Sequence, residues 1–120
     1  MDDLLIATGK TSVLDFGPEN AGIQIKDHKI VHNRYLQTTA PHIFLAGDIA
    51  GPYLFTHTGY YQSYIATHNA FSRIKTKPDY SVVPRAVFIS PEIASVGMTQ
   101  KDAEEKGIKV RTGIAPIAIL

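Results

Sequence analysis

The sequence of 120 residues contains no cysteine. Without thiols the chain forms no disulfide, offers no thiolate to a metal ion and performs no thiol redox chemistry itself. The five histidines are His28, His32, His42, His57 and His68. Their spacing is not typical of a metal site. The sequence therefore predicts no metal centre, and each histidine is interpreted as a surface or helix-face residue.

An excess of charge of one sign is also missing. Lys and Arg together number 12, and Asp and Glu number 11. No basic run is present that would neutralise several phosphates, which argues against nucleic acid and anionic membranes as partners. Apolar stretches such as Ile43–Ala46 fall far short of the roughly 20 residues that cross a bilayer. Because the N-terminus is acidic where a secretory signal would be basic, we predict a soluble, cytoplasmic protein.

Common catalytic and nucleotide-binding motifs are absent from the sequence. It contains no Gly-x-Ser-x-Gly elbow, no Walker-type phosphate loop and no Gly-x-Gly-x-x-Gly turn. The sequence therefore argues against a Ser-His-Asp triad. A nucleotide bound by this chain would lack the usual pyrophosphate cradle.

Apolar runs and turn residues in the first part predict strands and a hairpin. Leu4–Thr8 and Ile43–Ala46 are short apolar runs that each end at a glycine, as is typical of strands buried on both faces. Between them, the alternating Ile23–Lys26 is expected to pair with Lys29–Val31 as a small hairpin.

From about Thr58 to Ile74 the apolar period changes to three and four, which predicts a helix. The recurring residues are Tyr61, Tyr64, Ile65, His68 and Phe71. We interpret the tyrosines as core packing and surface coverage rather than as an aromatic binding box.

The polar, proline-containing stretch Lys75–Asp79 is the predicted domain boundary, so that the domains span residues 1–77 and 78–120. Beyond it, Ala86–Ile89 and Ala94–Val96 are predicted strands. A helix should begin after Thr99, with Asp102 in its first turn, and end near Lys106. A further strand is expected from Ile108 to about Arg111.

The sharpest local feature is Ala46-Gly47-Asp48 after an apolar run, followed by a loop ending at Phe55-Thr56-His57 and the long predicted helix. A carboxylate at the carboxyl end of a strand lies where ligands enter open sheets, and it accepts hydrogen bonds from ligand hydroxyls. The N–H groups at a helix start favour an electron-rich or anionic ligand group. The alternative is that Asp48 is a plain turn or capping residue.

An ordered series of motifs resembles the pyridine nucleotide-disulfide oxidoreductases, which include dihydrolipoyl dehydrogenase, glutathione reductase and mercuric reductase. The motifs are Asp3–Lys10, Ala21–Ile23, Gln37–Asp48, Thr56–His57, Pro84 and Ser90–Thr99. They cover essentially the whole chain, and they are most similar to the dihydrolipoyl dehydrogenase and mercuric reductase branches. The resemblance implies an α/β fold for the first part, which would be the later half of a Rossmann-like FAD-binding domain. The second part would be the truncated start of an α+β dimerisation domain, so that the chain as a whole is of the α+β class.

The resemblance also implies roles around FAD. The Asp of the Gly47-Asp48 pair would hydrogen-bond the ribityl chain. Backbone N–H groups at the helix start would approach the pyrimidine edge of the flavin, and they belong to Phe55, Thr56 and His57. Since reduction of the flavin places negative charge near that edge, a helix N-terminus would stabilise the reduced form.

The turn formed by Ala7, Thr8 and Gly9 is implied to pass close to FAD, where the family's chain re-enters the FAD domain after the NAD(P) domain. Gly9 would permit that close approach. Lys10 departs from the family, which often has Arg there, and an ammonium does not reproduce the geometry of a planar guanidinium.

The family's glycine-rich dinucleotide motif, redox-active cysteine pair and NAD(P) domain precede the segment that this chain resembles, and its catalytic His-Glu pair follows. We therefore expect part of an FAD-dependent, NAD(P)H-dependent oxidoreductase, homodimeric when complete, that acts on a disulfide, a dithiol or mercuric ion. The 120 residues alone are expected to be inactive, to retain FAD weakly or not at all, and to self-associate through unpaired strand edges.

Two alternatives stay open. One is a non-catalytic binding or dimerisation module on the same scaffold, and the other is a relative that uses flavin and NAD(P)H without redox cysteines. Both ends of the chain are interpreted as cut inside apolar runs, although Leu120 closing a buried strand is the alternative at the C-terminus.

Overall fold

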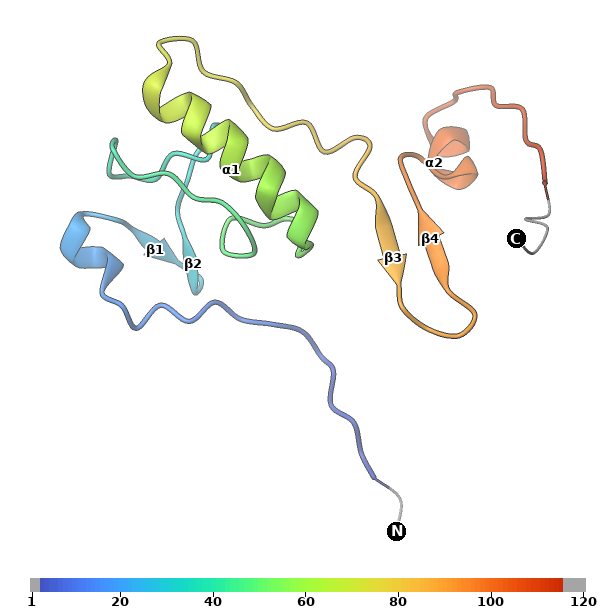
Figure 1. The fold of residues 1–120 in the computed structure, drawn as a ribbon, viewed down its shortest axis with the longest axis horizontal. Coiled ribbons are helices and arrows are strands. Elements are labelled where there is room, and N and C mark those ends of the chain that lie inside the picture. The colour runs from blue at the N-terminus through green and yellow to red at the C-terminus, as the bar shows by residue number, and fades with distance from the viewer. Residues whose placement is uncertain (1–2, 116–120) are drawn as a thin grey trace. The chain divides into compact units, whose positions relative to one another are not determined.

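The structure is a computed structural model, and it describes residues 3–115. The chain divides into two compact units, Met1–Pro78 and Asp79–Leu120. The elements of the first unit are η1 (Pro18–Ala21), β1 (Ile25–Lys26), β2 (Lys29–Ile30) and α1 (Thr56–Phe71) (Figure 1). Those of the second are β3 (Arg85–Val87), β4 (Ile93–Ser95) and α2 (Gln100–Glu105). Each unit therefore mixes helix with short strands.

The hairpin predicted from the alternating residues is confirmed. β1 and β2 are antiparallel, with Ile25 opposite Ile30. The turn residues Asp27 and His28 have φ values of 50° and 57°, the left-handed conformation that a tight two-residue hairpin turn requires. Ile30 is buried in a core cluster with Ile23, Ala40 and Leu45.

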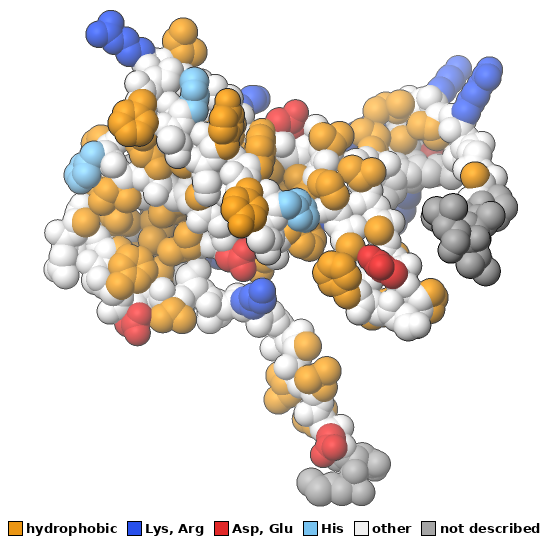
Figure 2. Space-filling model, viewed as in Figure 1, with side chains coloured by type: hydrophobic (Ala, Val, Ile, Leu, Met, Phe, Trp, Pro, Cys, Tyr) orange, Lys and Arg blue, Asp and Glu red, His pale blue; other side chains and the backbone are white. Residues whose placement is uncertain are grey.

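Neither apolar run that was predicted as a buried strand forms one. Leu4–Thr8 pairs with no other described segment, and Leu4, Leu5 and Ile6 are 74–87% exposed. Figure 2 shows hydrophobic side chains exposed along the N-terminal segment. The second run, Ile43–Ala46, makes one isolated bridge, between Phe44 and Gln37. A strand needs a partner along its edge, and an apolar run does not supply one by itself. The strand predictions were therefore wrong for both runs.

Helix α1 is confirmed, but of the five residues that gave its predicted period only Ile65 is buried. Its buried residues are Thr58, Gln62, Ile65, Ala66 and Asn69. Tyr64 and Phe71 are instead 73% and 89% exposed. The helix packs against loops, whose backbone groups need hydrogen-bond partners, so polar side chains occupy the buried face.

Asn69 shows how that face works near the C-terminal end of α1. Its Nδ2 donates to the carbonyl oxygens of Tyr35 at 2.9 Å and Thr76 at 2.7 Å, and its Oδ1 accepts from Thr76 N at 2.7 Å. The side chain is 0% exposed. Asn69 therefore fastens the helix to the loop before it and to the segment after it.

In the second unit, β3 and β4 pair antiparallel, with Val87 opposite Ile93. Both strands were predicted from the sequence. The strand predicted at residues 108–111 does not form, and that prediction was wrong. Ile108 N instead donates to Ala103 O at 2.9 Å, because Gly107, with a φ of 67°, turns the chain back over the end of α2. The predicted apolar end, residues 117–120, lies outside the described residues.

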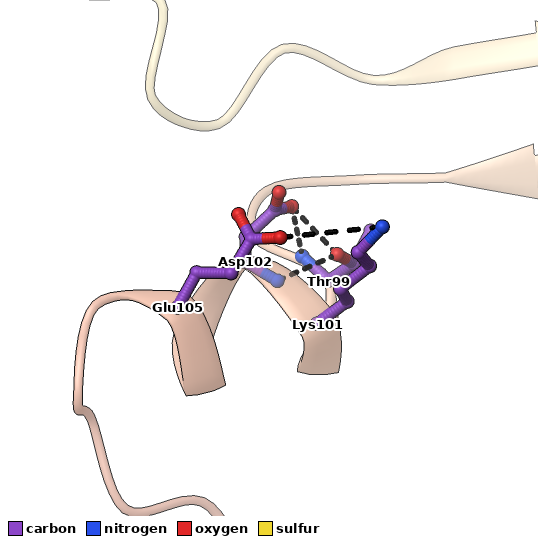
Figure 3. A network of polar contacts seen from close by, with 4 residues as sticks. All are labelled: Thr99, Lys101, Asp102 and Glu105. Carbon is purple, nitrogen blue, oxygen red and sulfur yellow. Dashed lines mark hydrogen bonds and ion pairs between the residues drawn. The ribbon is translucent and has the colours of Figure 1, made fainter.

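The start of α2 is a capping box, as Thr99 and Asp102 predicted (Figure 3). Asp102 N donates to Thr99 Oγ1 at 3.2 Å, and Thr99 N donates to Asp102 Oδ2 at 3.0 Å. The hydroxyl of Thr99 also donates to Asp102 Oδ2 at 2.6 Å. The pKa of Asp102 lies below its ordinary value of 3.8, mainly because of the hydrogen bond from the Thr99 hydroxyl. The hydrogen bond from the Thr99 backbone lowers this pKa further.

Replacing Ile65 by Ala should lower the free energy of unfolding by about 2–5 kcal/mol, because it opens a cavity beside Leu36 and Ala66. The matched control is Tyr64→Ala on the same helix, whose side chain is mostly exposed and whose effect should stay within about 0.5 kcal/mol. Urea denaturation measures both variants. Equal losses would contradict the assignment of the buried face.

Replacing Thr99 by Ala should raise the pKa of Asp102 toward its ordinary value, because the hydroxyl bond is lost, whereas Thr99→Ser keeps it. Since the folded-state pKa is lowered, the cap stabilises α2 above the ordinary pKa and is lost as the pH falls through the lowered value. An NMR titration of the Asp102 carboxyl carbon measures the shift. An unchanged pKa in the Ala variant would refute this cause.

Candidate functional site

Asp48 lies in a tight turn that we call the Asp48 loop, residues 47–51. Ala50 N donates to Gly47 O at 2.9 Å, and Gly51 N donates to Asp48 O at 3.2 Å. Gly47 and Gly51 have φ values of 84° and 57°, so glycine suits both ends of the turn. The Asp48 side chain is 55% exposed. The loop thus presents a carboxylate that ligand hydroxyl groups can reach.

The N-terminus of α1 has no side-chain cap from its N-cap residue. That residue is Phe55, in an extended conformation, and the first turn contains no acidic side chain. The rings of Phe55 and His57 stack with their centroids 5.3 Å apart. The positive end of the helix dipole therefore lies at Thr56, and no carboxylate in the first turn offsets it. This positive end favours an electron-rich group of a ligand.

The Asp48 loop lies directly against the first turns of α1. Gly47 N donates to Gln62 Oε1 at 2.7 Å. A Cβ on Gly59 would lie only 3.2 Å from the Cα of Gly47, so the absence of a side chain at Gly59 lets helix and loop approach. The structure thus brings together the two features of the sequence that pointed to a ligand, the carboxylate and the helix start.

A hollow of about 580 Å³ opens beside the loop. Its lining includes Lys10, Ser12, His32, Asp48, Pro52 and Leu54, but not Phe55, Thr56 or His57. Lys10 Nζ lies 3.8 Å from Asp48 Oδ2, with the two side chains 71% and 55% exposed. An ion pair this exposed contributes little to stability, so a ligand that displaces Lys10 loses little.

Thr8 and Gly9 lie in the exposed segment that precedes the hollow. Gly9 has a φ of 132°, which glycine tolerates best, but no heavy atom lies within 4 Å of where its Cβ would be. The approach of Gly9 to FAD stays a prediction, and Lys10 is the first residue of this segment that lines the hollow.

Gln62 is a site residue that the sequence analysis missed. It is 0% exposed although its side chain is polar. The sequence signal was the polar set Thr58, Gln62 and Asn69 at helical spacing, which reads as a solvated face until the loops that it contacts are known. Thr58 Oγ1 is buried with no hydrogen-bond partner.

Neither a metal centre nor a membrane span is found in the part of the chain that the structure describes. Among residues 3–115, no three His, Asp or Glu residues are grouped so that they could hold a metal ion. No helix in that range is long and apolar enough to cross a bilayer. The candidate site is therefore defined by a carboxylate, a helix N-terminus and the hollow beside them.

Comparison with known proteins identifies the class. Residues 1–73 match the family model described as pyridine nucleotide-disulphide oxidoreductase. Residues 83–119 match the model of the dimerisation domain of the same enzymes. The chain belongs to the pyridine nucleotide-disulphide oxidoreductase family, which confirms the resemblance carried by its ordered motifs.

Individual relatives are similar over nearly the whole chain. The mycothione reductase of Mycobacterium tuberculosis is 36% identical over 94% of this chain, and the mercuric reductase of Staphylococcus aureus is 36% identical over 97%. The dihydrolipoyl dehydrogenase of Bacillus subtilis is 36% identical over 85%. The chain spans 26%, 22% and 22% of the lengths of these three proteins.

A solved structure is similar as well. The HOCl-induced flavoprotein disulfide reductase RclA from Escherichia coli is 33% identical, with a TM-score of 0.73. The similarity covers 84% of this chain and 24% of that one. Sequence and structure therefore agree on the family, and the chain corresponds to about a quarter of each relative.

Replacing Gly59 by Ala tests the contact between helix and loop. Inside an ordinary helix this change stabilises by about 1 kcal/mol. Here the new Cβ would press on the Gly47 backbone at 3.2 Å, so we expect the gain to be cancelled and the free energy of unfolding to fall. Thermal denaturation, with the exposed Thr67→Ala as the control on the same helix, measures this. A full gain at Gly59 would contradict the close packing.

Proposed function

We propose that this chain provides the ribityl and flavin contacts for FAD, and dimer contacts, in an FAD-dependent NAD(P)H oxidoreductase. One observation carries the proposal: in a chain of this family, the Asp48 loop packs against the first turn of α1 at Gly59 and is hydrogen-bonded through Gly47 to Gln62 in the second turn. The family uses FAD and NAD(P)H. A carboxylate and a helix N-terminus held together suit the two ends of a flavin with its ribityl chain.

The residues present fit that cofactor. Asp48 accepts hydrogen bonds only, which suits the donor hydroxyls of a ribityl chain. The first turn of α1 is not capped by the Phe55 side chain, so its dipole end suits the electron-rich pyrimidine edge of a flavin. FAD, when bound, supplies the hydride and electron transfer, and these residues bind and orient it.

The remaining expected roles are part of the same proposal. Backbone N–H groups of Phe55, Thr56 and His57 approach the pyrimidine edge. The turn at Thr8 and Gly9 passes close to FAD. Residues 1–77 belong to a Rossmann-like FAD domain, and residues 78–120 belong to the domain that joins two subunits.

The substrate class is a disulfide, a dithiol or mercuric ion. The relatives named mycothione reductase, mercuric reductase and dihydrolipoyl dehydrogenase are each 36% identical to this chain, so similarity does not choose among them. Because these 120 residues contain no cysteine, any thiol chemistry is carried out by residues outside them.

Replacing Asp48 by Ala in the complete polypeptide that carries these residues should weaken FAD binding about tenfold to a hundredfold. The reason is the loss of a charged hydrogen-bond acceptor, worth about 1.5–3 kcal/mol. Quenching of flavin fluorescence measures the dissociation constant. Asp15→Ala, an exposed carboxylate that does not line the hollow, is the control and should bind FAD normally. Unchanged binding by the Asp48 variant would refute the proposed role.

A further inference from the structure

One side chain holds both ends of the Asp48 loop. Gln62 Oε1 accepts from Gly47 N at 2.7 Å, and Gln62 Nε2 donates to Gly51 O at 2.5 Å. A primary amide carries one acceptor oxygen and one donor nitrogen, so it matches an N–H at one end of a turn and a C=O at the other. An ionised glutamate side chain has no donor, so it can pair with the N–H but not with the C=O. Gln62 is 0% exposed and both bonds are part-buried, so water competes only weakly for them.

The hairpin side of the first unit holds the same loop from another direction. His32 Nε2 lies 3.1 Å from Ala50 O, and His32 Nδ1 lies 2.9 Å from Asn33 O. The backbone of α1 approaches at Gly59, as described above. The backbone of the loop is therefore fixed by groups on both sides, while the carboxylate of Asp48 stays exposed.

We propose that Gln62 is a positioning residue for the Asp48 carboxylate, and that it acts by pinning the two ends of the loop against α1. This inference rests on the proposed function, in which Asp48 binds the ribityl chain of FAD. A pinned loop presents its carboxylate in one arrangement, so binding does not have to order it. Without the amide, the part-buried Gly47 N–H and Gly51 C=O lose this partner, and the loop shifts to find others.

Replacing Gln62 by Glu separates the two bonds. The ionised carboxylate still accepts from Gly47 N, but it places a negative oxygen against the Gly51 carbonyl. In the complete polypeptide we expect FAD to bind about tenfold more weakly at neutral pH. As the pH falls, the buried carboxyl takes up a proton and its O–H becomes a donor to Gly51 O, so affinity should recover. The unaltered protein should not gain affinity over the same range, and an equal pH profile for both would contradict the proposal.

A double-mutant cycle separates positioning from general destabilisation. If Gln62 acts through Asp48, Gln62→Ala weakens FAD binding about tenfold when Asp48 is present, and it has little effect in the Asp48→Ala background. The matched control is Asn69→Ala, which removes an equally buried amide from the same face of α1 but one that holds other segments. Its effect on FAD affinity should be small and the same in both backgrounds. Equal losses for Gln62→Ala in the two backgrounds would overturn the proposal.

Hydrogen exchange of the Gly47 amide tests the role of Gln62 without relying on FAD binding. Gln62→Ala should speed this exchange in the protein without FAD, and Asn69→Ala should not. Unchanged exchange at Gly47 would overturn the role of Gln62 and leave FAD binding by Asp48 standing. Faster exchange, combined with FAD affinity that does not depend on Asp48, would instead refute the proposed function and retain only the pinning of the loop.

Discussion

The paired hydrogen bonds of the buried Gln62 amide join the two halves of the candidate site. They connect α1 with both ends of the Asp48 loop, 15 and 11 residues away in sequence. Leaving either backbone group without a partner would cost about 1–3 kcal/mol, so the loop and the helix are held as one piece. The exposed carboxylate and the uncapped helix N-terminus therefore keep a defined relation to each other.

The same principle explains why α1 has a polar buried face. A helix that covers a sheet buries apolar side chains, because the strands satisfy each other's backbone groups. A helix that covers loops must supply donors and acceptors, and Asn69 does this near the C-terminal end of α1 as Gln62 does in its second turn. The apolar contribution comes mainly from Ile65 and Ala66, which pack on Leu36.

Local rules predicted the features whose causes are local. The β1–β2 hairpin, the capping of α2 by Thr99 with Asp102, and the presence of helix α1 each depend on neighbouring residues, and each is confirmed. The choice of Asp48 as a candidate site residue also rested on neighbouring residues, and it stays a prediction. What failed depended on distant partners: the apolar runs predicted a pairing that no described segment provides, and the buried face of α1 depends on which loops it meets. Gln62 was missed for that reason.

The family membership links these contacts to the proposed binding of FAD. The most direct test of this account is a crystal structure of the complete polypeptide with FAD. The account predicts the Asp48 carboxylate within hydrogen-bond distance of a ribityl hydroxyl and the N-terminus of α1 facing the pyrimidine ring, with both Gln62 bonds intact. A ribityl chain that is bound elsewhere, or an Asp48 loop detached from Gln62, would contradict it.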